Sequence, residues 1–173
     1  MKTLLSALFS FILPASVLAD SIQIGQLAPE FSLTDQHQQI RHLEDYRGKW
    51  VVLYFYPKDD TPGCTKEACS FRDNINAIIS QQAVILGVSV DSVSDHQAFA
   101  DKFKLPFSLL ADPKGLVATQ YDALLNLGFL RFAKRHSFII DPKGRIAKIY
   151  RNVDPQTHVG EILKDLNRLQ KAI

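Results

Sequence analysis

Two cysteines, Cys64 and Cys69, stand five positions apart in the stretch TPGCTKEAC. A structural disulfide stabilises a protein most when it closes a long loop, and this pair would close a short one. On an ideal helix, residues five apart have Cα atoms roughly 8 to 9 Å from each other. That separation exceeds the ~7 Å within which a disulfide forms without backbone movement. Either the segment is not helical, or the pair alternates between a helical dithiol and an unwound disulfide.

The segment before Cys64 has the signals of a helix start. Thr61 is a good N-cap residue and Pro62 suits the first helical position, which places Cys64 in the first turn. Backbone N–H groups without internal partners favour a thiolate there. A helix terminus supplies at most ~2 kcal/mol of that stabilisation. We therefore expect help from a nearby cation, for which the candidates are Lys58, Lys66, Arg72 and Arg135.

Buried strands and helices alternate around this segment. The run WVVLYFY, residues 50–56, is apolar throughout and ends at Pro57, which predicts a strand buried on both faces. A second such run covers residues 83–90, and helical spacing between the two predicts a βαβ unit. Further elements are expected as helices at 93–104, 115–124 and 158–173 and as strands at 107–112, 135–141 and 145–151.

The order of these elements predicts the fold class. Two DPKG stretches, Asp112–Gly115 and Asp141–Gly144, predict turns, the second of which joins a hairpin. Residues 30–35 and 39–49 predict an N-terminal hairpin followed by a short helix. We expect an α/β fold with a central mixed sheet, helices on both sides and this hairpin as an extension.

The first nineteen residues differ in composition from the rest. Lys2 precedes the apolar run of residues 4–13, and the small-residue pattern VLA ends at Ala19. This predicts a secretory signal peptide cleaved after Ala19; a retained anchor or a core helix is the alternative. Residues 20–173 would then form a single domain in the periplasm or another exported location, with no stable membrane association after cleavage.

Composition argues against several other functions. The 20 basic and 18 acidic residues are scattered without a run of one sign, so nucleic acid is not expected as a partner. The histidines show no metal-ligand spacing, and there is no glycine-rich nucleotide motif. We therefore expect neither a metal nor a cofactor.

The segment YPKDDTPGCTKEACSFRD resembles the active-site segment of the peroxiredoxins, specifically the bacterioferritin comigratory protein or peroxiredoxin Q type. Pro57, Thr61 and Cys64 match the family pattern, and Cys69 matches the second cysteine of this subgroup. RHSFIIDPKGRI is similar to the family's arginine-containing strand and hairpin, which assigns the family's active-site arginine to Arg135. GQLAPEFSLTDQ is similar to the family's N-terminal hairpin.

This resemblance implies a thioredoxin-like fold and a thiol peroxidase. Cys64 would be the peroxidatic cysteine, reacting with hydrogen peroxide and organic hydroperoxides, and Cys69 the resolving cysteine of an intrachain disulfide. Thr61 would hold the peroxide, Pro57 would shield the pocket and Arg135 would stabilise the charge. A thioredoxin-like protein would recycle the enzyme, which is expected to be a monomer.

Other interpretations of the cysteine pair are an ordinary local disulfide and two small buried side chains. At the level of function, the alternatives are an exported thiol-disulfide oxidoreductase and a non-catalytic redox sensor. The first normally uses C-x-x-C, which this chain lacks. The apolar stretch Leu124–Arg135 departs from the polar loop expected of many relatives, and its role stays open.

Overall fold

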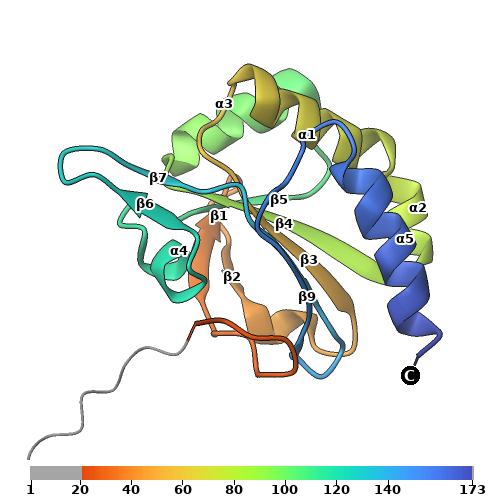
Figure 1. The fold of residues 1–173 in the computed structure, drawn as a ribbon. Helices are drawn as coiled ribbons and strands as arrows, with labels where there is room; N and C mark the ends of the chain where they lie inside the picture. The colour runs from red at the N-terminus through yellow and green to blue at the C-terminus, as the bar shows by residue number, and fades with distance from the viewer. Residues whose placement is uncertain (1–20, 173) are drawn as a thin grey trace, which may run out of the picture.

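A computed structural model describes residues 21–172 of the protein. They form a seven-stranded sheet in the order β2-β1-β5-β4-β3-β8-β9 (Figure 1). Strands β3, β4 and β5 are parallel, and the other pairs are antiparallel, so the predicted mixed sheet is confirmed. The strands are β1 (Ser32–Asp35), β2 (Ile40–His42), β3 (Trp50–Phe55), β4 (Ala83–Ser89), β5 (Ser108–Ala111), β8 (Ser137–Ile140) and β9 (Ile146–Tyr150).

Helices cover both faces of this sheet, and each face has its own apolar cluster. The first cluster draws on α1, α2, α3 and α5, and the second on η1, α4 and the segment before β1. The predicted signal peptide, residues 1–19, lies outside the described residues. The helices are η1 (Leu43–Tyr46), α1 (Pro62–Asp73), α2 (Ile75–Ser80), α3 (Val93–Phe103), α4 (Leu116–Gln120) and α5 (His158–Gln170).

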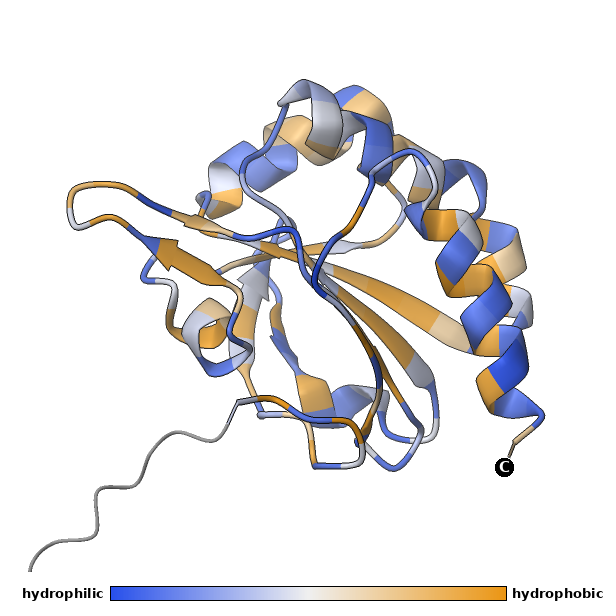
Figure 2. Ribbon diagram, viewed as in Figure 1, coloured by the Kyte–Doolittle hydropathy of each residue, from blue (hydrophilic) through white to orange (hydrophobic). Residues whose placement is uncertain are grey.

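Strand β3 is an interior strand of the sheet, between β4 and β8. All six of its residues are buried, and they alternate between the two clusters, as the period of a strand requires. The hydropathy colouring shows the same apolar character along β3 and β4 (Figure 2). The carboxyl end of β3 therefore has a fixed position, and the chain leaves it directly toward α1.

The first helix is seated on the sheet by aromatic packing. The rings of Tyr54 and Phe71 lie 4.8 Å apart between centroids. Gly87, the parallel partner of Tyr54 in β4, makes room for the tyrosine: a Cβ atom there would lie 2.8 Å from the Tyr54 hydroxyl oxygen. The helix that carries Cys64 is thus fixed relative to β3.

Two helices are shorter than predicted. The helix predicted between the two apolar runs breaks at Asn74, whose side-chain amide donates to the carbonyl of Ser70 at 2.9 Å and so satisfies a helix-end acceptor. The predicted helix at 115–124 is wrong beyond Gln120. There Asp122 has a left-handed φ of 53°, and the chain turns into a strand.

The apolar stretch Leu124–Arg135 forms a two-stranded hairpin of β6 (Leu124–Asn126) and β7 (Arg131–Ala133). Its tip projects from the body of the molecule, and Phe129 is 97% exposed. Both DPKG turns are confirmed, and the second joins β8 to β9. Within residues 21–172, no helix has the length and apolar character to cross a membrane.

Candidate active site

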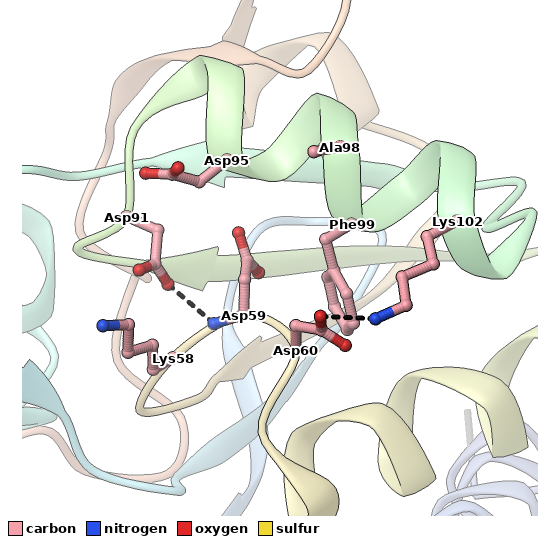
Figure 3. Close-up of a pocket in the computed structure, with 8 residues that line it drawn as sticks. All are labelled: Lys58, Asp59, Asp60, Asp91, Asp95, Ala98, Phe99 and Lys102. Carbon is pink, nitrogen blue, oxygen red and sulfur yellow. Dashed lines mark hydrogen bonds and ion pairs between the residues drawn. The ribbon is translucent and has the colours of Figure 1, made fainter.

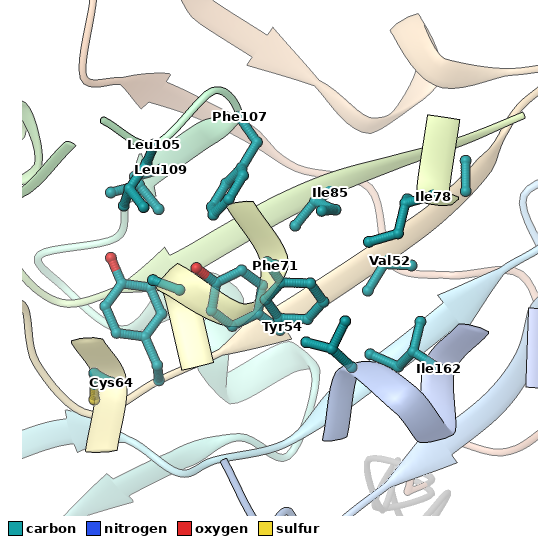
Figure 4. Packing of buried hydrophobic residues seen from close by; sticks show 14 of the residues in the cluster. Val52, Tyr54, Cys64, Phe71, Ile78, Ile85, Leu105, Phe107, Leu109 and Ile162 are labelled. Carbon is teal, nitrogen blue, oxygen red and sulfur yellow. The ribbon is translucent and has the colours of Figure 1, made fainter. Parts of the chain in front are cut away.

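Cys64 lies in the first turn of α1, just beyond the carboxyl end of β3. It is only 2% exposed and forms one edge of the first apolar cluster (Figure 4). The first backbone hydrogen bond of this turn runs from the Thr65 amide to the Thr61 carbonyl at 2.8 Å. The amides of Gly63 and Cys64 precede that bond, so they have no acceptor within the helix. A negatively charged oxygen could be bound there.

Arg135 brings a positive charge to the sulfur. Its Nη2 donates to Cys64 Sγ at 3.3 Å, and its Nη1 donates to Glu67 Oε2. Arg135 stands two residues before β8, which is the antiparallel neighbour of β3, and β8 thereby fixes the guanidinium beside the cysteine. The structure thus selects Arg135 from the four candidate cations. Lys58 and Lys66 are exposed, and Arg72 pairs with Asp73 and the carbonyl of Phe103.

Glu67 is a fully buried carboxyl group that the sequence patterns did not single out. It lies three residues after Cys64, on the same face of α1, and that spacing was the available signal. Burial raises the pKa of Glu67 to about 7, although the adjacent Arg135 lowers it. Its Oε1 has no hydrogen-bond partner among the described residues. Glu67 is therefore poised to change charge near neutral pH, next to the reactive sulfur.

This carboxyl group gives a prediction for stability. Since Glu67 has a pKa of about 7 in the folded protein and about 4.5 when unfolded, the folded form retains a proton that the unfolded form releases between these values. The free energy of unfolding should therefore fall as the pH rises through this window, by on the order of 3 kcal/mol. Glu67→Gln should remove that contribution, as measured by urea denaturation across the window.

Other groups titrate over the same range, so the informative quantity is the difference between the two proteins. His158, for instance, acts in the opposite direction, because burial and Arg135 lower its pKa to about 4. Glu44→Gln, which removes an exposed carboxylate in η1, is the matched control. Parallel curves for wild type and Glu67→Gln would contradict the prediction.

Pro57 and Thr61, the other two predicted site residues, lie between β3 and α1, and Thr61 does not cap the helix through its side chain. It occupies the N-cap position, and its hydroxyl instead donates to the carbonyl of Lys58 at 3.0 Å. The N-cap position expected of Thr61 is therefore confirmed, although its side chain makes no capping hydrogen bond. The hydroxyl oxygen remains an acceptor. Pro57 is half-buried, two residues after the end of β3.

The loop between β3 and α1 is anchored to α3 and its preceding turn (Figure 3). The Asp59 amide donates to Asp91 at 2.9 Å, and Lys102 pairs with Asp60 at 2.5 Å. The Asp59 carboxylate also contacts the buried His96 ring at 2.7 Å. These carboxylates line a hollow of about 340 Å³. Their hydrogen bonds and ion pairs within the chain account for their positions without a ligand. They hold the approach to Cys64 in place.

Cys69 lies five residues further along α1, half-buried, and both cysteines are free thiols. The helix is continuous from Pro62 to Asp73, so the pair has the helical geometry in which no disulfide can form. Bonding between the two sulfurs therefore requires that the first turns of α1 unwind.

The arrangement can be compared with known proteins. The profile of the AhpC/TSA family matches residues 24–149. The chain belongs to this family. It is 44% identical over 149 residues to the putative peroxiredoxin Bcp of Coxiella burnetii, covering 83% of this chain and 97% of the relative. It is 43% identical to peroxiredoxin Bcp of Bacillus subtilis, covering 87% of this chain and 99% of that protein. The chain is accordingly a peroxiredoxin.

Solved structures agree with this membership. Peroxidoxin BcpB from Mycobacterium tuberculosis superimposes with a TM-score of 0.80 at 32% identity, covering 85% of this chain and 97% of that one. The bacterioferritin comigratory protein of Xanthomonas campestris gives a TM-score of 0.75 at 30% identity, covering 80% of this chain and 90% of that one. The predicted thioredoxin-like fold of the peroxiredoxins is thereby confirmed.

Proposed function

We propose that this peroxiredoxin reduces hydrogen peroxide and organic hydroperoxides with Cys64 as the peroxidatic cysteine. The observation that carries the proposal is the placement of Cys64 Sγ in the first turn of α1 with the Arg135 guanidinium at 3.3 Å. Free backbone N–H groups and a fixed cation both favour the thiolate, which is the nucleophilic form of the side chain. Alkyl peroxide reduction is an activity of the structurally similar bacterioferritin comigratory protein of Xanthomonas campestris, which supports the proposal.

The first step is an attack of the Cys64 thiolate on one oxygen of the peroxide. The S–O bond forms as the O–O bond breaks, the sulfur is oxidised to a sulfenic acid, and the other oxygen leaves as water or an alcohol after taking up a proton. Arg135 and the amides of the first turn would stabilise the charge that moves onto the leaving oxygen. The Thr61 hydroxyl would position the peroxide, and Pro57 would shield it from water.

The second step joins the two cysteines. The Cys69 thiol attacks the sulfenic sulfur, a disulfide forms and water leaves. A thioredoxin-like dithiol then reduces this disulfide by exchange. Both sulfurs belong to one chain, so a monomer can complete the cycle. Each turnover requires α1 to unwind and reform.

Cys69→Ser tests this sequence of steps. With one equivalent of peroxide, the wild-type protein should lose two hydrogens in mass, whereas the variant should gain one oxygen on Cys64. With excess peroxide the variant should overoxidise to the sulfinic acid and should not turn over with a thioredoxin-like reductant. A variant that sustained wild-type turnover would exclude Cys69 as the resolving cysteine.

We also propose that the protein is exported, on the basis of the charged, apolar and small-residue pattern of residues 1–19. In an oxidising compartment the enzyme would need a dedicated thioredoxin-like reductant, for which a membrane-tethered domain is the simplest source. Expression of the full chain in a bacterium, followed by fractionation and N-terminal sequencing, should yield periplasmic protein beginning at Asp20. Intact chain in the cytoplasm would contradict export.

A further inference from the structure

A surface hollow of about 560 Å³ borders the candidate active site and is rich in cationic side chains. Three of its side chains carry a fixed positive charge, and one carries a negative charge. Its volume lies in the range of pockets that hold small organic ligands. The lining residues are Lys134, Arg135, His136, Arg151, Asn152, Val153 and Asp154.

The hollow adjoins the reacting centre through Arg135. Arg135 belongs to both, since its Nη2 contacts Cys64 Sγ at 3.3 Å. The loop that forms the far wall reaches the first turn of α1: a Cβ atom on Gly63 would lie 3.8 Å from Pro155 and 3.3 Å from Arg135. A small molecule could therefore contact the hollow with one end and the cysteine turn with the other.

The polar groups of the hollow are incompletely paired within the described chain. His136 is 8% exposed, and its Nδ1 is buried without a hydrogen-bond partner there. Lys134 makes no ion pair with any residue of 21–172, and Arg151 reaches Asp122 only at 3.4 Å. The one acidic side chain, Asp154, already accepts a hydrogen bond from the Gln156 amide at 2.9 Å. Donors and positive charge thus exceed acceptors.

The charges on this surface are close enough to influence one another. Burial lowers the pKa of His136, and Arg151 and Lys134 lower it further, so a neutral imidazole lies among cations. The buried carboxyl group of Glu67 accepts a hydrogen bond from Arg135 and offsets its positive charge. Lys134 is the cation of the hollow without an ion-pair partner among residues 21–172. Arg151 uses only Nη2 for Asp122 and the Ile22 carbonyl, so its other nitrogens remain available to an anion.

We propose that this hollow binds the carboxylate of an organic hydroperoxide, so that Cys64 reacts preferentially with anionic hydroperoxides. The proposal rests on the peroxidase function described above and adds the substrate class. A carboxylate has the planar pair of acceptors that a guanidinium binds well. Neutral peroxides and esters offer no charge to this surface.

The test compares a short-chain hydroperoxy carboxylic acid with its methyl ester. Both are reacted with the reduced protein in a stopped-flow instrument at low and at physiological ionic strength. The acid should react faster, with a ratio of kcat/KM values of roughly threefold to tenfold at low salt. This ratio should shrink as salt rises, because the charges are solvent-accessible. Since it is an internal comparison, partial loss of folded protein does not affect it.

The double substitution Lys134→Gln and Arg151→Gln should bring the ratio close to one. Lys49→Gln is the matched control, because Lys49 is an exposed lysine at the opposite end of β3 and should leave the ratio at the wild-type value. A wild-type ratio of one, or a ratio that the double substitution leaves unchanged, would overturn the proposed substrate class alone. Failure of both peroxides to oxidise Cys64 would overturn the peroxidase proposal and this one with it.

Discussion

Cys64→Ser should abolish peroxide consumption, with a loss of kcat/KM of at least about a thousandfold. The serine hydroxyl has nearly the size of the thiol, so the first turn of α1 and its packing should persist. The hydroxyl is not ionised at neutral pH and its oxygen cannot be oxidised to a sulfenic acid analogue. The variant should therefore fold normally and leave peroxide untouched, as followed by peroxide loss in the presence of a thioredoxin-like reductant.

Cys69→Ser is the matched control for this experiment, because it removes the other thiol from the same helix. Given one equivalent of peroxide, that variant should still consume it, whereas Cys64→Ser should consume none. Circular dichroism and urea denaturation establish that both variants are folded. If Cys64→Ser kept the wild-type rate, the assignment of the peroxidatic cysteine would be wrong.

Arg135→Met should lower the rate constant for oxidation of Cys64 by roughly 10²- to 10³-fold. The guanidinium is the cation placed against the sulfur, at 3.3 Å, and methionine fills similar space without the charge. Single-turnover oxidation of the reduced protein measures the chemical step directly. Arg135→Lys should also be impaired, since one ammonium group cannot reproduce the planar fork that reaches both Glu67 and Cys64.

The same substitution leaves Glu67 buried without its partner, which is a separate effect on stability. Loss of one member of a buried ion pair costs about 3 to 5 kcal/mol unless the remaining group is neutralised. The double variant Arg135→Met with Glu67→Gln removes the carboxylate as well. It should recover stability without recovering the oxidation rate. Recovery of the rate in the double variant would show that Arg135 acts only through folding.

Local patterns in the sequence were sufficient to predict several features of the site. The apolar run before Pro57 predicted the central buried strand, and Thr61 with Pro62 predicted where α1 begins. The distance limit for a disulfide on a helix predicted that Cys64 and Cys69 cannot be bonded while α1 is intact. These inferences need only the geometry of one element, so no tertiary information was required.

Features that depend on contacts between distant segments were not predictable in the same way. Four cations were candidates for the partner of Cys64, and only the pairing of β8 with β3 shows that Arg135 reaches it. Glu67 is buried because α1 packs against the sheet. A glutamate within a helical stretch of sequence does not show which face of the helix will be covered. The β6–β7 hairpin was likewise missed, because Leu127, Phe129 and Leu130 at its protruding turn are apolar yet exposed.

The central claim is that Cys64 is the sulfur that peroxide oxidises and that α1 must open before Cys69 can bond to it. Hydrogen exchange measured by mass spectrometry on the reduced protein and on protein treated with one equivalent of peroxide tests both parts together. We expect protected amides from Thr65 onward in α1 in the reduced form. After oxidation we expect a disulfide between Cys64 and Cys69 and loss of that protection. Oxygen found on another residue, or a disulfide formed while α1 stayed protected, would contradict the claim.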